Sequence, residues 1–133
     1  MAESSYFHST IAAYDATADL YAELIGTEIS SAIEGPVDRA LLEAFAELVV
    51  RSNGLIADIG CGTGRVAAFL ATRGVNVVGV EPSPGMLALA AAAHPHHRFE
   101  FGAIDTTTIR DADGAHESTP QAFLLALHRG PTA

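Results

Sequence analysis

Apolar residues recur at helical spacing in two segments near the start of the chain. The first segment covers residues 9 to 33 and carries the apolar set Ile11, Tyr14, Ala18, Tyr21, Ile25 and Ile29. Steps of three and four residues place this set on one face of an amphipathic helix, with a break at Gly26. A second helix is expected after Gly35-Pro36, with the apolar set Val37, Leu41, Ala44, Phe45 and Leu48 inside and the acidic residues outside.

The middle of the chain alternates short apolar runs with helical spacing. Residues 55–59, 75–80 and 98–101 are predicted strands, and residues 65–73 and 84–93 are predicted helices, the second capped by Ser83. Strands that are apolar on both faces, joined by helices of about ten residues, indicate parallel βαβ units. The expected fold is α/β, a Rossmann-like three-layer αβα arrangement with helices on both faces of a parallel sheet.

The last part of the chain has a different character. Residues 106–114 are polar and predict a loop, and residues 120–129 predict a short helix, although their apolar run is also compatible with a strand. We expect one domain over residues 1–133. It divides into an N-terminal cap region (1–35), a βαβαβ core (36–105) and an atypical C-terminal segment (106–133).

Composition and charge exclude several classes of protein. A hydrophobic fraction of 49% with 17% charged residues excludes disorder as the default. A net charge of −9, with seven arginines and no lysine, argues against a nucleic-acid partner. The longest apolar run, Leu87 to Ala93, is too short for a membrane span. The single cysteine, Cys61, cannot form an internal disulfide, and no secretory signal is seen, so a cytoplasmic location is expected.

A glycine-rich turn, Asp58-Ile59-Gly60-Cys61-Gly62-Thr63-Gly64, lies between a predicted strand and a predicted helix. Ligands of open α/β sheets bind at this end of the strands. A dinucleotide fingerprint needs glycine at the sixth place, where Arg65 stands, and a nucleotide-triphosphate loop needs lysine. The acidic Asp58 suits a ligand with an ammonium group better than a pyrophosphate.

Three sequence elements resemble class I S-adenosylmethionine-dependent methyltransferases. Residues 55–64 resemble the first motif of that family, and residues 77–83 resemble its second strand with an acidic end. Glu81 follows Gly60 by 21 positions, near the spacing of about 20 at which a carboxylate reaches a ribose. Upstream, Tyr14-Asp15-x-x-Ala18-x-x-Tyr21 resembles the helix that covers the cofactor cleft in many small-molecule methyltransferases. The resemblance covers residues 10–105.

The resemblance implies a site for S-adenosylmethionine. Its implied residues are Tyr14, Tyr21, Asp58, Gly60, Cys61, Gly62, Thr63, Gly64, Glu81, Pro82, Met86, Ala103, Ile104 and Asp105. The three glycines would lie under the methionine part of the cofactor, Asp58 near its amino group, and Glu81 at the ribose hydroxyls. Pro82 and Met86 would pack near the adenine. The family often has an aspartate beside the adenine amino group, at the position where Ala103 stands in this chain. The backbone groups of residues 103–104 would contact the adenine in its place, and Asp105 is the nearest carboxylate.

The expected function is transfer of a methyl group to a small-molecule acceptor. The alternative is a truncated cofactor-binding or inactive fragment, because the family sheet has seven strands and three are clear in this sequence, as if truncated after the third strand. No catalytic base is identified. Cys61 is interpreted as a small loop residue rather than a nucleophile, and residues 94–97, His-Pro-His-His, as a solvated loop rather than a metal site.

The predicted strand 55–59 raises a question of pairing. In the family strand order 3-2-1-4 it would lie at an open edge of the sheet unless a fourth strand covers it. We therefore expect residues 120–129 to cover it, or a second copy to form a homodimer there, or the edge to stay open in an unstable fragment.

Overall fold

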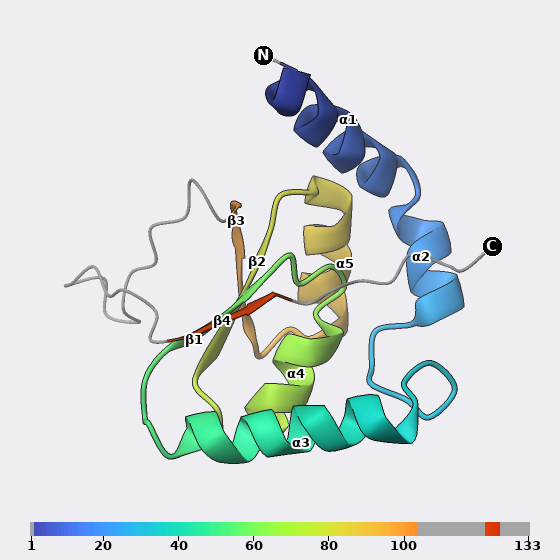
Figure 1. Ribbon diagram of the computed structural model, residues 1–133. Helices are drawn as coiled ribbons and strands as arrows, with labels where there is room; N and C mark the ends of the chain where they lie inside the picture. Colours follow the sequence, from blue (N-terminus) through green and yellow to red (C-terminus); the bar gives the residue numbers. More distant parts are fainter. Residues whose placement is uncertain (1, 104–121, 126–133) are drawn as a thin grey trace.

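The computed structural model describes residues 2–103 and 122–125. This part of the chain forms five helices and four strands, whose arrangement is drawn in Figure 1. The helices are α1 (Ala2–Ala16), α2 (Ala18–Ile25), α3 (Pro36–Val50), α4 (Arg65–Thr72) and α5 (Pro84–Ala93). The strands are β1 (Ile56–Ile59), β2 (Val77–Glu81), β3 (Arg98–Phe101) and β4 (Ala122–Leu125). The predicted alternation of strands and helices from residue 55 to residue 101 is confirmed.

The strands form one parallel sheet in the order β3-β2-β1-β4. Ile56 of β1 lies opposite Val77 on one side and Ala122 on the other. Of the three alternatives expected at this edge of β1, coverage by residues 120–129 is the one seen: β4 pairs there, in the place where a second copy would otherwise pair. The short helix predicted over residues 120–129 is wrong at 122–125, where the apolar run pairs with unsatisfied backbone groups of β1. The sheet also extends beyond the third strand, where truncation was expected.

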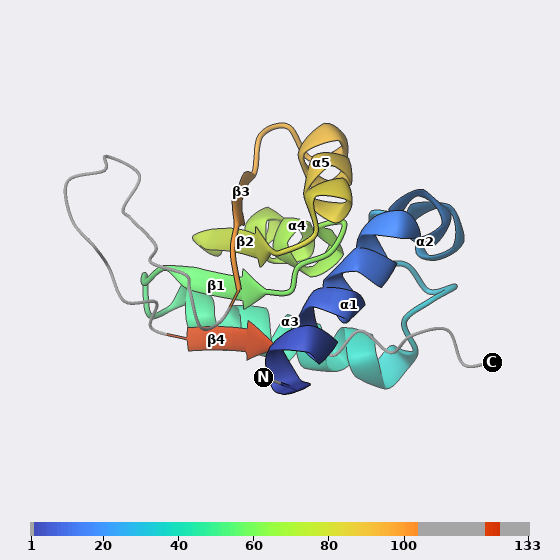
Figure 2. The ribbon, with the colours of Figure 1, turned by 90° about the horizontal axis from the view of Figure 1, so that it is seen from above.

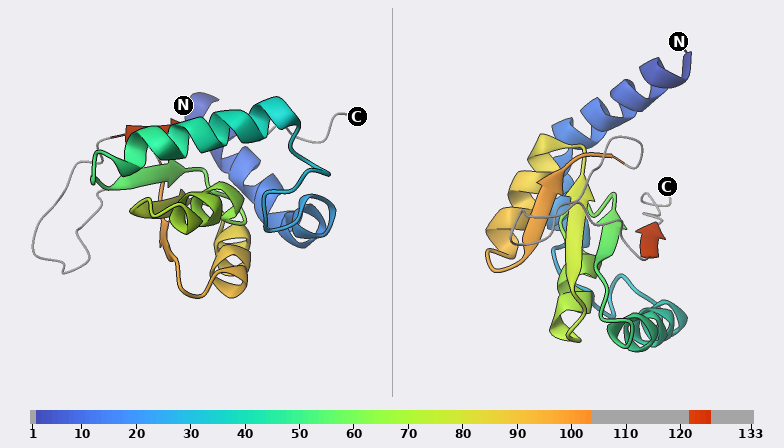
Figure 3. Two further views of the ribbon diagram at one scale, coloured as in Figure 1. Left: turned by 90° about the horizontal axis from the view of Figure 1, so that it is seen from below. Right: turned by 90° about the vertical axis from the view of Figure 1, so that its left-hand side faces the viewer.

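One face of the sheet carries the helices α3, α4 and α5. Ile56 of β1 packs there against Ala46 of α3 and Leu70 of α4, and α3 runs beneath β1 and β4 (Figure 3). On the opposite face, Ala57 and Val78 belong to a separate buried cluster. The parallel sheet with its flanking helices confirms the predicted Rossmann-like α/β fold, and within the described residues the helices lie on one face of the sheet. Two successive right-handed crossovers in one direction place both of their helices on the same side.

The N-terminal helices lie across the ends of the strands. Figure 2 shows α1 beyond the tips of β1 and β2, and both α1 and α2 pack against α5. The two helices separate at Thr17, whose side chain hydroxyl donates to the Ala13 carbonyl at 2.8 Å. α2 ends as predicted at Gly26, which has a φ of 84°. The helix predicted as far as residue 33 is wrong beyond this glycine, and residues 26–35 form the α2–α3 loop.

The face of α3 that packs on the sheet differs from the predicted one. Ala46 is buried, with Phe45 and Val49 beside it. By contrast, Leu41 and Leu48, which were expected inside, are 63% and 71% exposed. The spacing rule found the helix correctly, but both faces of α3 carry apolar residues, so it could not decide which face is buried.

This burial pattern predicts different costs for two identical substitutions. Leu70→Ala is expected to lower the free energy of unfolding by about 2–5 kcal/mol, because Leu70 is fully buried. Leu48→Ala is expected to change it by less than about 0.5 kcal/mol, since that side chain is already in solvent. Urea unfolding of the two variants measures the contrast. Equal losses would show that the outer face of α3 is covered.

Candidate functional site

The glycine turn lies between β1 and α4 with three residues in the left-handed region of φ. The φ angles are 77° at Gly60, 56° at Gly62 and 82° at Gly64. A Cβ at Gly60 would meet no atom within 4 Å, so the backbone there faces open space. A Cβ at Gly64 would come within 2.7 Å of the Phe99 ring, so this glycine serves internal packing. The turn thus leaves room for a ligand at Gly60.

Glu81 ends β2 beside this turn and is held in a fixed position. One carboxylate oxygen accepts from the Gly62 N–H at 2.9 Å, and the other accepts from the Ser83 N–H at 3.0 Å. The residue is 7% exposed. Each oxygen keeps a further lone pair, so the carboxylate can still accept hydrogen bonds from two hydroxyls of a ligand.

Asp58 is a buried carboxylate one strand away from Glu81. It is fully buried, and neither of its oxygens has a hydrogen-bond partner among the described residues. Burial raises the pKa of Asp58 to about 7, and the negative charge of Glu81 adds to the rise. The backbone amide of Ala67 opposes the shift without meeting hydrogen-bond geometry. A buried acceptor without a partner fits a site that takes a cationic or hydrogen-bonding ligand nearby.

A cavity of about 310 Å³ opens between the N-terminal helices and the glycine turn. Of the expected site residues, those that line it are Tyr14, Tyr21, Gly60, Gly62, Glu81, Pro82 and Met86. The structure thus brings together α1, α2, the turn and the end of β2. Ala103 is buried after β3 but does not line the cavity. Residues 104 and 105, also expected there, lie outside the described residues.

Two further expected residues support the turn from behind. Cys61 is 2% exposed, and its sulfur would lie 2.9 Å from a Cβ at Gly79 in β2. Burial raises the pKa of the Cys61 thiol, and the charges of Asp58 and Glu81 raise it further, so a thiolate nucleophile is disfavoured. The Thr63 hydroxyl donates to the Gly26 carbonyl at 3.0 Å. Both side chains hold the turn rather than face the cavity.

The sequence reasoning missed four residues of the cap. Phe7, Thr10 and Ile11 of α1 also line the cavity; their helical spacing before Tyr14 was the available signal. Asp15 was part of the quoted motif but received no role. Its carboxylate oxygen accepts from the Gly85 N–H at 2.6 Å and from the Ser83 hydroxyl at 3.1 Å. Asp15 therefore fastens α1 to the start of α5, beside Glu81.

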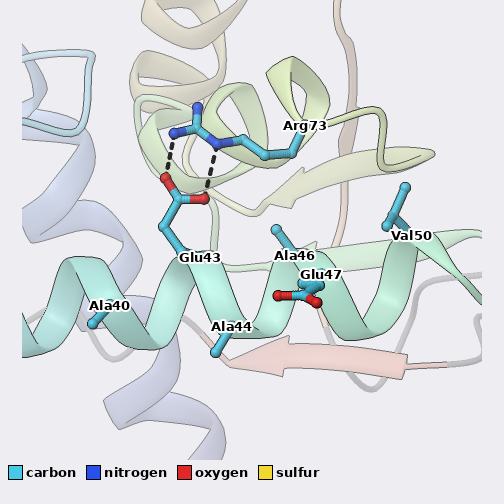
Figure 4. Close-up of a pocket in the computed structure, with 7 residues that line it drawn as sticks. All are labelled: Ala40, Glu43, Ala44, Ala46, Glu47, Val50 and Arg73. Atoms are coloured by element: carbon cyan, nitrogen blue, oxygen red, sulfur yellow. Dashed lines mark hydrogen bonds and ion pairs between the residues drawn. The ribbon is translucent and has the colours of Figure 1, made fainter.

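Other candidate sites carry less chemistry. A larger hollow of about 450 Å³ (Figure 4) lies between α3 and Arg73, which forms an ion pair with Glu43. It adjoins the far end of α4, away from the glycine turn.

His94 is bound to the Thr27 carbonyl at 2.8 Å. Within residues 2–103 and 122–125 no group of three acidic, histidine or cysteine residues could hold a metal ion, and no helix there could cross a membrane.

Comparison with known proteins points to one family. The family model described as "Methyltransferase domain" matches residues 56–124. The chain is similar to the 23S rRNA (uracil(1939)-C(5))-methyltransferase RlmD of Nitrosococcus oceani, with 29% identity over 68% of this chain and 20% of that protein. It is also similar to trans-aconitate 2-methyltransferase of Escherichia coli, with 36% identity over 46% of this chain and 25% of that protein.

Solved structures give likenesses of the same kind. One is CalS10, an amino pentose methyltransferase from Micromonospora echinaspora, with a TM-score of 0.46, 32% identity, and coverage of 53% of this chain and 31% of that chain. A TehB-like S-adenosylmethionine-dependent methyltransferase from Corynebacterium glutamicum has a TM-score of 0.47 and 24% identity, covering 71% and 49%. The chain spans between a fifth and a quarter of the length of the curated relatives named above.

Proposed function

This chain belongs to the class I S-adenosylmethionine-dependent methyltransferase family, and on that premise we propose that it binds S-adenosylmethionine in the cavity beside α1 and methylates a small molecule. The observation that carries the proposal is the Glu81 carboxylate, fixed at the cavity wall by the Gly62 and Ser83 amides. Its free lone pairs suit two vicinal hydroxyls of a ribose, and a carboxylate there would repel a phosphorylated ribose.

The residues at the site have separate binding roles in this proposal. Gly60 leaves space for the amino-acid part of the cofactor, and the buried charge of Asp58 attracts its ammonium group from behind the turn. Pro82 and Met86 offer an apolar wall for the adenine. When bound, the cofactor supplies a methyl group activated by a sulfonium. Tyr14 and its neighbours on α1 close the cavity from the side of solvent and help to exclude water.

The described cavity residues supply binding and orientation rather than proton transfer. Among them Glu81 is the one carboxylate, and two amides already fix it. Holding the acceptor in line with the methyl carbon and the sulfur would provide much of the rate. This arrangement favours an acceptor whose nucleophilic atom needs no early loss of a proton. The same observation supports the second candidate, a cofactor-binding protein without catalysis.

Charge favours a small acceptor over RNA. The relative from N. oceani is named for an rRNA target, and the relative from E. coli for a small organic acid. In this chain the net charge is −9, and neither arginine nor lysine lines the cavity. Four arginines, Arg51, Arg65, Arg73 and Arg98, each pair with a glutamate. A phosphate backbone would therefore meet few free cations.

Calorimetric titration tests the cofactor proposal. We expect saturable heats with S-adenosylmethionine and with S-adenosylhomocysteine, and no saturable heat with NAD. Binding of NAD without either sulfur compound would overturn the proposal. With the chain and labelled cofactor, and a panel of small carboxylates, amines, phenols and RNA fragments, transfer to a small carboxylate and not to RNA is the expected result. Binding without transfer to any acceptor would favour the second candidate.

A further inference from the structure

The α2–α3 loop is fastened to the cofactor side of the fold by three side chains. The successive carbonyls of Gly26, Thr27 and Glu28 accept hydrogen bonds at 3.0, 2.8 and 3.2 Å. Their donors are Thr63 of the glycine turn, His94 at the end of α5, and Arg65 at the start of α4. An irregular loop is thereby held to elements far from it in sequence, and through it the helices α1 and α2 are held as well.

Arg65 is the residue that joins this loop to the cavity. It is 7% exposed, and its guanidinium pairs with Glu34 of the loop while its Nε donates to the Glu28 carbonyl. The guanidinium also lies near enough to the Tyr21 hydroxyl for its charge and its N–H groups to oppose the rise that burial causes in the pKa of Tyr21. Tyr21 belongs to α2 and lines the cavity. Arg65, the first residue of the helix that follows the glycines, thus binds the loop and lies beside Tyr21 of the cap.

We propose that Arg65 is a positioning residue, whose guanidinium fixes the Tyr21 hydroxyl at the cavity wall and closes the cap onto the glycine turn. A planar fork with five donors can serve Glu34, the Glu28 carbonyl and Tyr21 at once, which a lysine ammonium on a flexible stem cannot. The inference rests on the proposed function, since it assigns Arg65 a part in shaping the cofactor cavity. Arg65 itself does not line that cavity.

A double-mutant cycle between Arg65 and Tyr21 tests the proposal. Arg65→Lys keeps a positive charge beside the partly buried Glu34, so folding is better preserved than with a neutral residue. We expect Arg65→Lys and Tyr21→Phe each to weaken S-adenosylhomocysteine binding by about fivefold to tenfold, and the double variant by no more than either alone. Losses that multiply in the double variant would overturn the proposal, because Arg65 would then not act through Tyr21.

His94→Leu is the matched control. This variant removes the hydrogen bond between the His94 ring and the Thr27 carbonyl, which belongs to the same loop. In that bond the partner of His94 is a loop carbonyl and not Tyr21. We expect the variant to lower the melting temperature, and its effect on binding to multiply with that of Tyr21→Phe. If it shows the same non-additive pattern as Arg65→Lys, general loosening of the loop explains the data and the specific role of Arg65 is wrong.

A readout without ligand separates this inference from the proposed function. Phe substitutions at Tyr6 and Tyr14 leave Tyr21 as the sole tyrosine. Burial raises the pKa of Tyr21, and the Arg65 charge and hydrogen bond oppose that rise. Arg65→Lys in this background should raise the Tyr21 pKa further, measured by phenolate absorbance with folding followed by circular dichroism. If the pKa of Tyr21 does not change in the variant, the role proposed for Arg65 is wrong, even if the wild type binds S-adenosylhomocysteine. If the pKa of Tyr21 shifts but the wild type does not bind S-adenosylhomocysteine, only the proposed function is wrong.

Discussion

Glu81→Gln is expected to weaken S-adenosylhomocysteine binding by about a hundredfold. The change replaces a carboxylate by an amide of the same shape. One end of the amide would then present N–H groups to the Gly62 or Ser83 amide, which now donate to the carboxylate at 2.9 and 3.0 Å. The variant also loses the charge-assisted hydrogen bonds proposed for the two ribose hydroxyls. Isothermal titration measures the change in affinity.

Glu43→Gln provides the control for this substitution. Glu43 is also a hydrogen-bonded glutamate, but its partner is the Arg73 guanidinium, and it lies on an exposed surface of α3 near the far end of α4. Exposed ion pairs contribute little to stability, so both affinity and melting temperature should stay near those of the wild type. Comparison of the unfolding curves shows whether Glu81→Gln remains folded. A folded Glu81→Gln variant with wild-type affinity would contradict the assignment of Glu81 to the ribose.

Local signals were sufficient for the centre of this fold. The apolar strand, the glycines and the acidic end of the next strand lie within thirty residues. Their spacing and the family resemblance together predicted that Gly60, Gly62 and Glu81 share one site, and all three line one cavity. Ser83 was predicted as a helix cap, and its hydroxyl accepts from the Met86 N–H at 3.2 Å. Such features depend on backbone geometry and short-range hydrogen bonds, which are determined by residues close together in the sequence.

Features that depend on distant partners were not predictable in the same way. Asp15 binds Gly85, which is 70 positions away, and nothing in the residues around Asp15 identifies that partner. Strand β4 exists because β1 offers an unpaired edge, which outweighs the local helix signals after Pro120. On α3 the composition left the buried face undecided, and packing against Leu70 selected it. In each case tertiary contacts chose between states that the local sequence allowed.

Asp58→Asn is expected to remove a pH dependence of stability. The ordinary pKa of an aspartate is 3.8, and burial raises that of Asp58 to about 7 in the folded protein. Between these values the folded state binds the proton more tightly than the unfolded state, so wild-type stability should fall as the pH rises from about 4 to about 7. The slope would reach at most about 1.4 kcal/mol per pH unit. The variant should be flatter over this range in urea unfolding, whereas Asp38→Asn on the exposed side of α3 should follow the wild type.

The same proton reports whether Asp58 senses the ligand. An ammonium group beside the turn would favour the charged carboxylate and lower its pKa. Because the pKa of Asp58 is about 7 without ligand, binding near pH 6.5 should release a fraction of a proton from the wild type. Titrations with S-adenosylhomocysteine in two buffers of different ionisation enthalpy measure that release as a difference in heat. Asp58→Asn should bind more weakly and show the release reduced or lost. Equal proton release in the variant and the wild type would mean that another group supplies the proton, and that the buried carboxylate does not face the amino group of the ligand.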